Sequence, residues 1–444
     1  MQMHIITIAF FSLKEELSLQ IHVVQQGETL FSIARLYSTS IISITEANEL
    51  DTPNLAIGQA LVIPIIGQYY FIQPNDTLFT IARRFQLSVE DLARINQLNL
   101  NYILPVGLRI YIPPQAKSTI QTFGYIEPIG ETVSSTLENA ANKNSPLLTY
   151  LAPFSYQANR DGTLTAPPIE TFQKIAKENN TKLAFVVSNL EDGQFSSELV
   201  HILLTVQAVQ NKLIDEIINT ATREGFQDVH FDFEYIPAAD CEAYNTFLQK
   251  VKGRLDQHQL TLSTALAPKT SGTQEGILYE AHDYETQGKI NDFVILMTYE
   301  WGYSTGPPLP VSPINEVERV LQYALSVMPK EKIMMGQNLY GYDWTLPFVQ
   351  GESFAQALSP QQAVKLAIEK KVAIQYDMRT QAPFFNYTDE NNREHIVWFE
   401  DARSIQAKFQ LVKRLGLRGI AYWKLGLSFP QNWLLLHDQF TIVK

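Results

Sequence analysis

Four polar side chains occupy alternate positions in an apolar segment, residues 226–237. In chain order they are Asp228, His230, Asp232 and Glu234. Successive side chains of a β-strand point to opposite faces, so these four would share one face of a strand. A carboxylic acid whose pKa is raised by burial beside a second carboxylate can act as a general acid. We therefore take Glu234 and Asp232, about 6–7 Å apart along a strand, as the candidate acid–base pair. A buried polar network with a structural role is the alternative.

The elements that must position this strand alternate in type from residue 121 onward. Short apolar segments predict strands at 122–128, 148–156, 182–189, 228–236, 260–268, 292–300, 332–340 and 418–426. Helical patterns lie between them, for example at 213–225 and 243–255. This alternation predicts an α/β fold with a (β/α)8 TIM barrel. An open, doubly wound sheet is the alternative, but the chain shows no glycine-rich phosphate loop. In a barrel, Glu234 would lie at the carboxyl end of its strand, where active sites form.

The connection between the last two predicted strands is long. Residues 372–401 have the pattern of antiparallel hairpins, with a turn at "TDENN" (388–392). We expect a small α+β insertion at about residues 345–400, on top of the barrel.

An internal repeat precedes the predicted barrel. Residues 22–64 and 70–114 share the same order of a short strand, two helices and a closing strand that ends in Ile-Pro. Thr29 and Thr77 stand where a side chain can cap the first helix of each unit. Each unit is therefore predicted to be a βααβ domain.

Composition excludes several classes of partner. With 34 Lys+Arg against 46 Asp+Glu the net charge is −12, and no basic cluster appears, which argues against nucleic acid. Cys241 is the one cysteine, so no intramolecular disulfide can form and a reducing compartment at synthesis is expected. We expect no metal site, because the histidines are scattered, and no cofactor.

The domain organisation follows from these patterns. Residues 1–20 are predicted to be an N-terminal extension, whose apolar run at 4–11 is too short to span a membrane and lacks the features of a secretory signal. One hypothesis is that residues 1–18 are not native, because "KEE" (14–16) is what a purine-rich ribosome-binding sequence encodes. The expected units are then 21–65, 69–114, a linker at 115–120, and 121–444.

Both repeats resemble LysM domains from end to end. The matching stretches are "GETLFSIA", "ITEAN" and "IGQALVIP" in the first, and "NDTLFTIA", "LARIN" and "VGLRIYIP" in the second. LysM domains bind the N-acetylglucosamine backbone of peptidoglycan or chitin, so the resemblance implies a sugar groove in each repeat. The implied contacts are Gly27, Thr29, Leu30, Asn54, Leu55, Asp76, Thr77, Leu78, Ile103 and Leu104. A small helical repeat used for protein contacts is the alternative.

The remaining chain resembles glycoside hydrolase family 18. The strand motif Asp-hydrophobic-Asp-aromatic-Glu is matched by "HFDFE" (230–234), and further matches are "MTYE" (297–300), "WFED" (398–401) and "YWKLG" (422–426). Family 18 is a substrate-assisted exception to the two-carboxylate scheme of glycosidases. By resemblance, Glu234 protonates the leaving oxygen, Asp232 orients the acetamido group of the sugar, and Tyr299 donates to its carbonyl oxygen.

The resemblance also implies a sugar-binding set around these residues. Its members are Trp423, which would stack on the cleaved sugar, with Glu300, Trp301, His230, Tyr125 and Tyr342. The alternative role for Trp423 is core packing. The alternative role for Tyr299 is a structural place in the barrel wall. Four positions depart from the family: Gln227, Asp228 and His230 stand where Asp, Gly and Asp are common, and Glu300 replaces the usual Asp. We expect His230 either to donate a hydrogen bond to Asp232 or to be a core histidine.

The domain combination resembles the spore-cortex-lytic N-acetylglucosaminidases of spore-forming bacteria. The resemblance implies a retaining hydrolase of peptidoglycan that acts as a monomer during germination, with neither nucleic acid nor a membrane span involved. It also implies synthesis in the mother cell without a signal peptide, and a place at the boundary of spore coat and cortex. A chitinase is the alternative enzyme, and a non-catalytic sugar-binding coat protein is the alternative of another class. We further expect turnover of soluble fragments to be unaffected by removal of residues 1–118.

Overall fold

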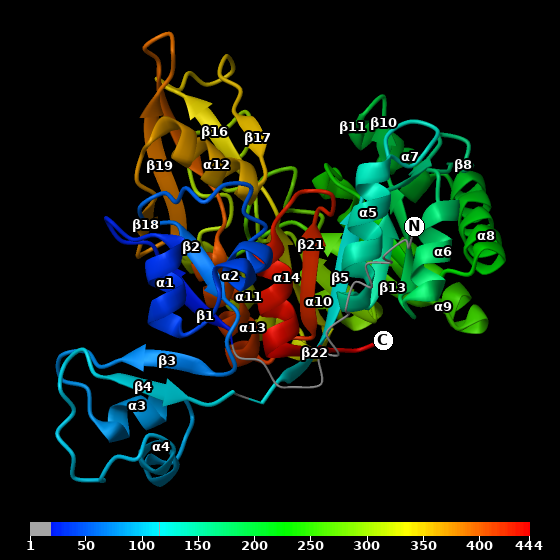
Figure 1. Ribbon diagram of the computed structural model, residues 1–444. Coiled ribbons are helices and arrows are strands. Elements are labelled where there is room, and N and C mark those ends of the chain that lie inside the picture. The colour runs from blue at the N-terminus through cyan, green and yellow to red at the C-terminus, as the bar shows by residue number, and fades with distance from the viewer. Residues whose placement is uncertain (1–18, 115) are drawn as a thin grey trace, which may run out of the picture.

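The computed structural model describes residues 19–114 and 116–444, so the hypothesis about residues 1–18 lies outside the described residues (Figure 1). Its centre is a closed ring of eight parallel strands, in which β9 pairs with β12. In chain order these are β5 (Ser118–Ile126), β6 (Tyr150–Pro153), β9 (Lys182–Ser188), β12 (Asp228–Asp232), β13 (Thr261–Leu266), β14 (Phe293–Leu296), β15 (Ile333–Asn338) and β21 (Gly419–Trp423). The predicted α/β barrel is confirmed, and each predicted strand is present in shortened or shifted form.

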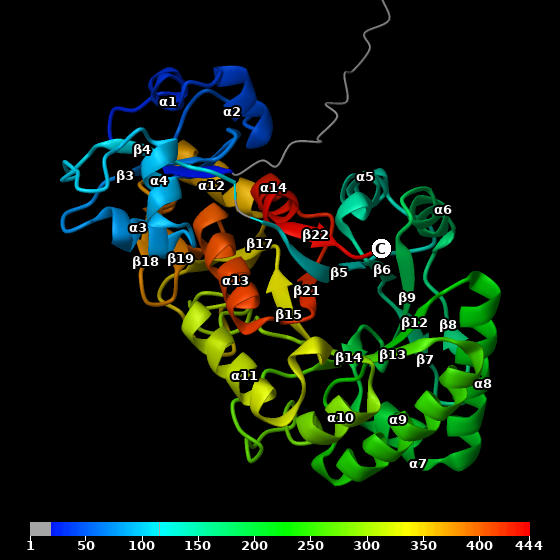
Figure 2. The same cartoon turned by 90° about the horizontal axis from the view of Figure 1, so that it is seen from below.

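Helices surround the ring of strands, as Figure 2 shows. They are α5 (Ser135–Asn144), α6 (Glu170–Glu178), α7 (Ser197–Thr205), α8 (Gln207–Glu224), α9 (Cys241–Leu255), α10 (Tyr284–Ile290), α11 (Ile314–Val327), α13 (Ala402–Leu415) and α14 (Pro430–Gln439). Short strands complete the barrel region: β7 (Tyr156–Ala158), β8 (Leu164–Thr165), β10 (Leu190–Glu191), β11 (Gln194–Phe195) and β22 (Phe440–Ile442). Single 3-10 turns lie at Ser145–Leu147, Ala238–Asp240, Asp256–His258 and Lys330–Lys332.

The two faces of β12 contact different parts of the hydrophobic core. Val229, Phe231 and Phe233 belong to the large core between strands and helices. His230 instead contacts Phe123, a member of the smaller aromatic core inside the barrel. The period-2 pattern therefore places the polar face of this strand inside the barrel, as the alternation of side chains requires.

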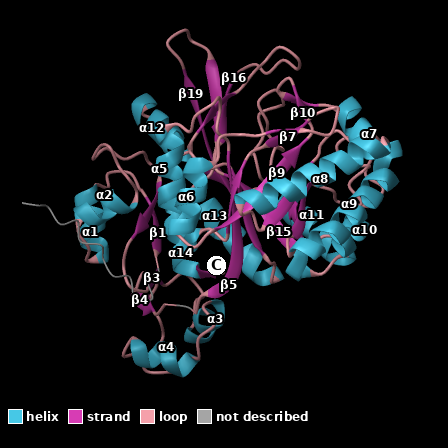
Figure 3. Ribbon diagram, turned by 90° about the vertical axis from the view of Figure 1, so that its right-hand side faces the viewer, coloured by secondary structure: helices cyan, strands magenta, loops and turns pink. Residues whose placement is uncertain are grey.

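The insertion lies above the carboxyl ends of the barrel strands (Figures 1 and 3). It is an antiparallel sheet in the order β17–β16–β20–β19–β18, with one helix, α12 (Pro360–Lys370). Its strands are β16 (Gly341–Thr345), β17 (Gln356–Leu358), β18 (Gln375–Asp377), β19 (Ala382–Thr388) and β20 (Glu394–Trp398). The sheet begins at Gly341, directly after β15, and thus slightly before the expected boundary.

The N-terminal repeats have the predicted βααβ order. Repeat 1 consists of β1 (Gln20–Val23), α1 (Leu30–Tyr37), α2 (Ile41–Ala47) and β2 (Ala60–Ile63). Repeat 2 consists of β3 (Gln68–Phe71), α3 (Leu78–Arg84), α4 (Val89–Ile95) and β4 (Arg109–Ile112). Thr29 and Thr77 both form the predicted caps, each in a reciprocal pair with the residue three positions on.

The repeats differ in how they meet the barrel. Ala60 and Val62 of repeat 1 belong to the main core, whereas repeat 2 projects away from the barrel in Figures 1 and 3. The barrel strand β5 itself starts at Ser118. Repeat 1 therefore packs on the barrel, and the expectation that removal of residues 1–118 leaves turnover unaffected stays a prediction. Within the described residues, no helix is long and apolar enough to cross a membrane.

Candidate active site

The site lies at the carboxyl end of β12. Asp232 is the last residue of the strand, and Glu234 follows two residues later. Asn189, at the end of the neighbouring β9, fixes the backbone of Glu234 through two hydrogen bonds. Its side chain accepts from the Glu234 N–H at 3.0 Å and donates to the Glu234 carbonyl at 2.9 Å. Asn189 is fully buried, and its two bonds fix the backbone from which the Glu234 side chain projects.

The two carboxyl groups are held away from bulk water. Burial raises the pKa of Glu234 well above its usual value, and the negative charges of Asp232 and Glu300 add to this effect. Burial likewise raises the pKa of Asp232 to about 7. One oxygen of Asp232, Oδ1, is buried and has no hydrogen-bond partner. Both shifts favour the protonated form, so the pair can hold a proton at neutral pH.

Tyrosines surround the carboxyl pair. Burial and the charges of Asp232, Glu234 and Glu300 raise the pKa of Tyr299, which keeps its hydroxyl protonated and able to donate. Glu300 accepts hydrogen bonds from Tyr340 and, at 3.1 Å, from Tyr342. Desolvation raises the pKa of Glu300, and these hydrogen bonds oppose the rise.

Trp423 ends strand β21 and closes the aromatic side of the site. Its ring stands edge-on to Tyr125 and to Phe154, with centroid distances of 5.4 and 4.9 Å. The structure thus brings Trp423 next to Tyr125, and Tyr299 and Tyr342 join the same group of apolar contacts. Trp301 is placed differently, because it packs against the core between strands and helices.

His230 does not contact Asp232, and the predicted hydrogen bond between them is wrong. Its Nε2 lies 2.7 Å from the hydroxyl of Tyr125, and its Nδ1 lies 2.7 Å from the hydroxyl of Ser263. Ser263 in turn donates to Asp228 at 2.6 Å. Strand register explains why His230 contacts Ser263, because the two residues are direct neighbours on β12 and β13. The imidazole bridges two hydroxyl groups and leaves Asp232 without this partner.

The hydrogen bonds in this chain follow one direction when the Ser263 hydroxyl donates to an ionised Asp228. Burial lowers the pKa of His230 to about 3, so the ring is neutral and carries one N–H. Ser263 gives its proton to Asp228, so it accepts from Nδ1–H, and Nε2 accepts from Tyr125. The Tyr125 hydroxyl proton consequently points to His230.

The residues predicted for sugar contacts in the repeats fall into two groups. Gly27, Thr29, Asn54, Thr77 and Ile103 are exposed, and Leu55 and Asp76 are half-buried. In contrast, the side chains of Leu30, Leu78 and Leu104 lie in the cores of the repeats. These leucines cannot present side chains to a groove.

Several residues of the site were not predicted. They are Asn189, Ser263 and Tyr340 in the barrel, with the exposed Phe31 (65%) and Phe79 (62%) at equivalent places in the repeats. The barrel residues come from separate strands, so no spacing within one motif reveals them. The two phenylalanines were detectable, because each directly follows a leucine that was predicted to contact sugar, Leu30 or Leu78, in the repeated pattern. In the part of the chain that the structure describes, no three His, Cys, Asp or Glu side chains are grouped so that they could hold a metal ion.

Comparison with known proteins agrees with this architecture. The family "Glycosyl hydrolases family 18" matches residues 121–427, and "LysM domain" matches residues 22–64 and 70–113. The chain is 57% identical over 427 residues to the cortical fragment-lytic enzyme of Bacillus subtilis (strain 168), covering 96% of this chain and 99% of the relative. Two crystal structures of the spore cortex-lytic enzyme SleL are similar over 96% of this chain and 99% of theirs. The Bacillus megaterium enzyme is 50% identical to this chain, with a TM-score of 0.87. The Bacillus cereus enzyme is 48% identical, with a TM-score of 0.89.

We predict that His230 supports the site by hydrogen bonding and not by titration. His230→Leu leaves the hydroxyls of Tyr125 and Ser263 without their partner inside the barrel. The free energy of unfolding should fall by about 1–3 kcal/mol for each buried group left unpaired. His230→Gln offers one acceptor and one donor and should lose less. Urea unfolding of both variants measures the difference.

The pH profile provides the control for this prediction. A ring with a pKa of about 3 does not change charge in the working range, so the acid limb of kcat/KM should stay in place in His230→Gln. A shift of that limb by more than about half a pH unit would show that the imidazole titrates.

Proposed function

We propose, since the chain belongs to glycosyl hydrolase family 18, that it hydrolyses N-acetylglucosamine linkages in the peptidoglycan of the spore cortex, with retention of the β-anomer. The observation that carries the proposal is the Glu234–Asp232 pair, in which a carboxylic acid is kept protonated at the mouth of the barrel. An acid with a raised pKa can protonate the leaving oxygen at neutral pH.

The proposed mechanism uses the substrate's own acetamido group. Its carbonyl oxygen attacks C1 as Glu234 gives its proton to the leaving glycosidic oxygen, and an oxazolinium ion forms. Water then adds to C1 while the Glu234 carboxylate takes a proton from it, which restores the acid and the acetamido group. Tyr299, kept as a phenol, donates to the acetamido oxygen during the attack.

Asp232 supplies charge and an unused acceptor. Its Oδ1 has no partner within the described protein, so it is free to accept the N–H of an acetamido group. The negative charge of Asp232 then stabilises the positive oxazolinium ion in a site of low polarity, where charge interactions are strong. Trp423 would face the cleaved sugar from the side that Tyr125 and Phe154 support.

The substrate class follows from the whole chain. The relatives with half or more of their residues identical are named as cortical fragment-lytic or spore cortex-lytic enzymes, and they share both LysM repeats and barrel. We propose the spore, at the boundary of coat and cortex, as the place of action. One chain supplies all residues of the proposed site, which fits action as a monomer.

Glu234→Gln should abolish cleavage. The amide keeps the size of the side chain but has no acidic proton to give, so we expect kcat to fall by about 10²–10⁴-fold. The measurement is release of reducing ends from cortex fragments, with the products identified by mass spectrometry. Products that end in reducing N-acetylglucosamine are expected from the wild type. Chitin oligosaccharides cleaved in preference to cortex fragments would favour a chitinase, and activity of Glu234→Gln within tenfold of the wild type would remove Glu234 as the acid.

Asp232→Asn should change both rate and pH dependence. The charge of Asp232 is one cause of the raised pKa of Glu234. Without it, Glu234 loses its proton at lower pH, so the basic limb of kcat/KM should move to lower pH. We also expect kcat to fall by about 10²–10³-fold, because the oxazolinium ion loses its counter-charge.

Asp228→Asn is the matched control for the basic limb. Asp228 is also buried, with its pKa raised to about 7, but its charge is not among the causes of the Glu234 shift. The limb should therefore stay in place in Asp228→Asn. An Asp232→Asn variant that changes only KM would contradict the proposed role of the charge.

A further inference from the structure

The two repeats carry equivalent glycines in different surroundings. Gly58 and Gly107 have φ angles of 81° and 84°, and each donates its N–H at 2.8 Å to the residue that follows the first strand, Val24 or Ile72. A Cβ on Gly107 would meet nothing within 4 Å. A Cβ on Gly58 would lie 1.8 Å from the carbonyl oxygen of Ile374 in the insertion. The same loop is thus free in repeat 2 and pressed against the catalytic unit in repeat 1.

Backbone hydrogen bonds fasten this loop of repeat 1. The Ile374 N–H donates to the carbonyl of Ile57 at 2.8 Å, and Arg403 donates to the carbonyl of Gly58 at 3.1 Å. Ala56, only 5% exposed, joins the apolar core of the insertion. By resemblance the adjoining residues 53–56 form one wall of a sugar groove, and the 56–58 segment beside them is docked against protein.

A second pair of equivalent residues shows the same difference. Asn48 and Asn96 each tie their own repeat together by bonding to a helix carbonyl and to the closing strand. Asn48 additionally accepts from Gln361 of the insertion at 2.7 Å and from Gln431 of α14 at 3.2 Å. No barrel or insertion partner of Asn96 is found among the described residues.

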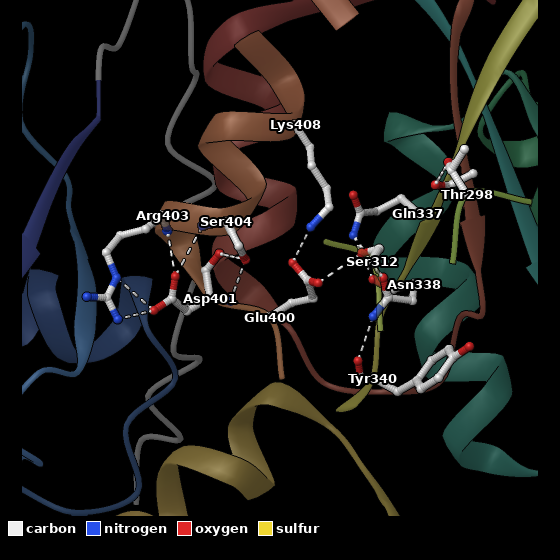
Figure 4. A network of polar contacts seen from close by, with 11 residues as sticks. Thr298, Ser312, Gln337, Asn338, Tyr340, Glu400, Asp401, Arg403, Ser404 and Lys408 are labelled. Atoms are coloured by element: carbon white, nitrogen blue, oxygen red, sulfur yellow. Dashed lines mark hydrogen bonds and ion pairs between the residues drawn. The ribbon is translucent and has the colours of Figure 1, made fainter. Parts of the chain in front are cut away.

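One short segment of the catalytic unit contacts repeat 1 and is linked toward the site through buried polar side chains. In residues 399–403, Phe399 packs in the same core as Ala56, and Asp401 holds Arg403 in a two-point ion pair. Glu400, between them, turns to the other side, where it meets Lys408 at 2.8 Å. Figure 4 shows Arg403 and Asp401 at the start of α13, with Glu400 and Lys408 beside them.

The ion pair continues toward the carboxyl groups of the site. Both partners are 1% exposed, and the Ser312 hydroxyl lies 3.0 Å from Glu400 and 2.6 Å from the side-chain oxygen of Asn338. This hydroxyl has one proton, which it can give to either of these two acceptors. Asn338 donates to the Tyr340 carbonyl at 2.7 Å. The hydroxyl of Tyr340 donates to Glu300. Figure 4 shows this row from Lys408 to Tyr340.

From this geometry we infer that repeat 1 is a positioning element of the catalytic cleft: docked through its 56–58 loop, it holds the 399–403 segment and thereby the Tyr340–Glu300 wall of the site. The inference rests on the proposed function, since it assigns repeat 1 to that same site. The corresponding loop of repeat 2 has no such contact and is exposed at Ile103 (89%) and Val106 (65%).

Gly58→Ala and Gly107→Ala in the full chain form a matched test. Both place a side chain at the same left-handed backbone angle, so the local strain is equal. Only the methyl group at position 58 collides with the insertion. The substrate is soluble cortex glycan fragments, which need no wall capture. We expect Gly58→Ala to lower kcat/KM by about fivefold or more, and Gly107→Ala to retain the wild-type value.

Hydrogen exchange tests whether the effect of Gly58→Ala on turnover passes through the 399–403 segment to residues 338–340. Gly58→Ala should speed amide exchange in residues 399–403 and at 338–340, whereas Gly107→Ala should leave both segments unchanged. Gln361→Ala, which removes the bond to Asn48 without a collision, should give a smaller change in the same direction. Equal turnover of Gly58→Ala and Gly107→Ala overturns the inference. So does lost turnover in Gly58→Ala with unchanged exchange at 338–340.

The same experiment separates the inference from the proposed function. If the wild type does not cleave the fragments, or Glu234→Gln cleaves them equally well, the proposed function fails. The exchange comparison still reports whether repeat 1 holds the 338–340 segment. If the wild type cleaves them and both glycine variants match it, only the positioning role fails.

Discussion

Two carboxyl groups that share a site with little water are the constraint on which the rest of the structure depends. Asp232 and Glu234 are separated by one residue at the end of β12, and their burial disfavours two charges at once. The barrel satisfies this constraint by keeping a proton on Glu234. It also supplies Asn189 to fix the backbone of Glu234 and Tyr299 as a neutral donor beside the pair. A free oxygen on Asp232 remains for the substrate.

Below this pair, a polar chain runs through the aromatic core inside the barrel. Asp228, Ser263, His230 and Tyr125 form this chain through successive hydrogen bonds. A buried polar network stabilises a fold only when its members are satisfied, and this chain meets that condition at every described link. The histidine at position 230 bonds to the hydroxyls of Tyr125 and Ser263 and makes no hydrogen bond to Asp232.

The sequence predicted what local periodicity determines. Alternation in 226–237 identified the inward face of β12, and capping threonines located the first helices of the repeats. It did not predict the partner of His230, because strand register between β12 and β13 chooses Ser263. Nor did it predict that Trp301 faces the outer core or that repeat 1 is docked. Those features depend on contacts between residues far apart in the chain, such as Gly58 and Ile374, which no single motif contains.

The central claim is that Glu234 holds a proton at neutral pH, and infrared difference spectroscopy tests it most directly. Spectra of the wild type and Glu234→Gln at pH 7 share every other carboxyl group, including Asp228, whose pKa is about 7. The account predicts that the wild type shows one additional carbonyl band of a protonated carboxylic acid, which disappears only well above pH 7. A difference spectrum that shows only an ionised carboxylate for Glu234 at pH 7 would contradict it.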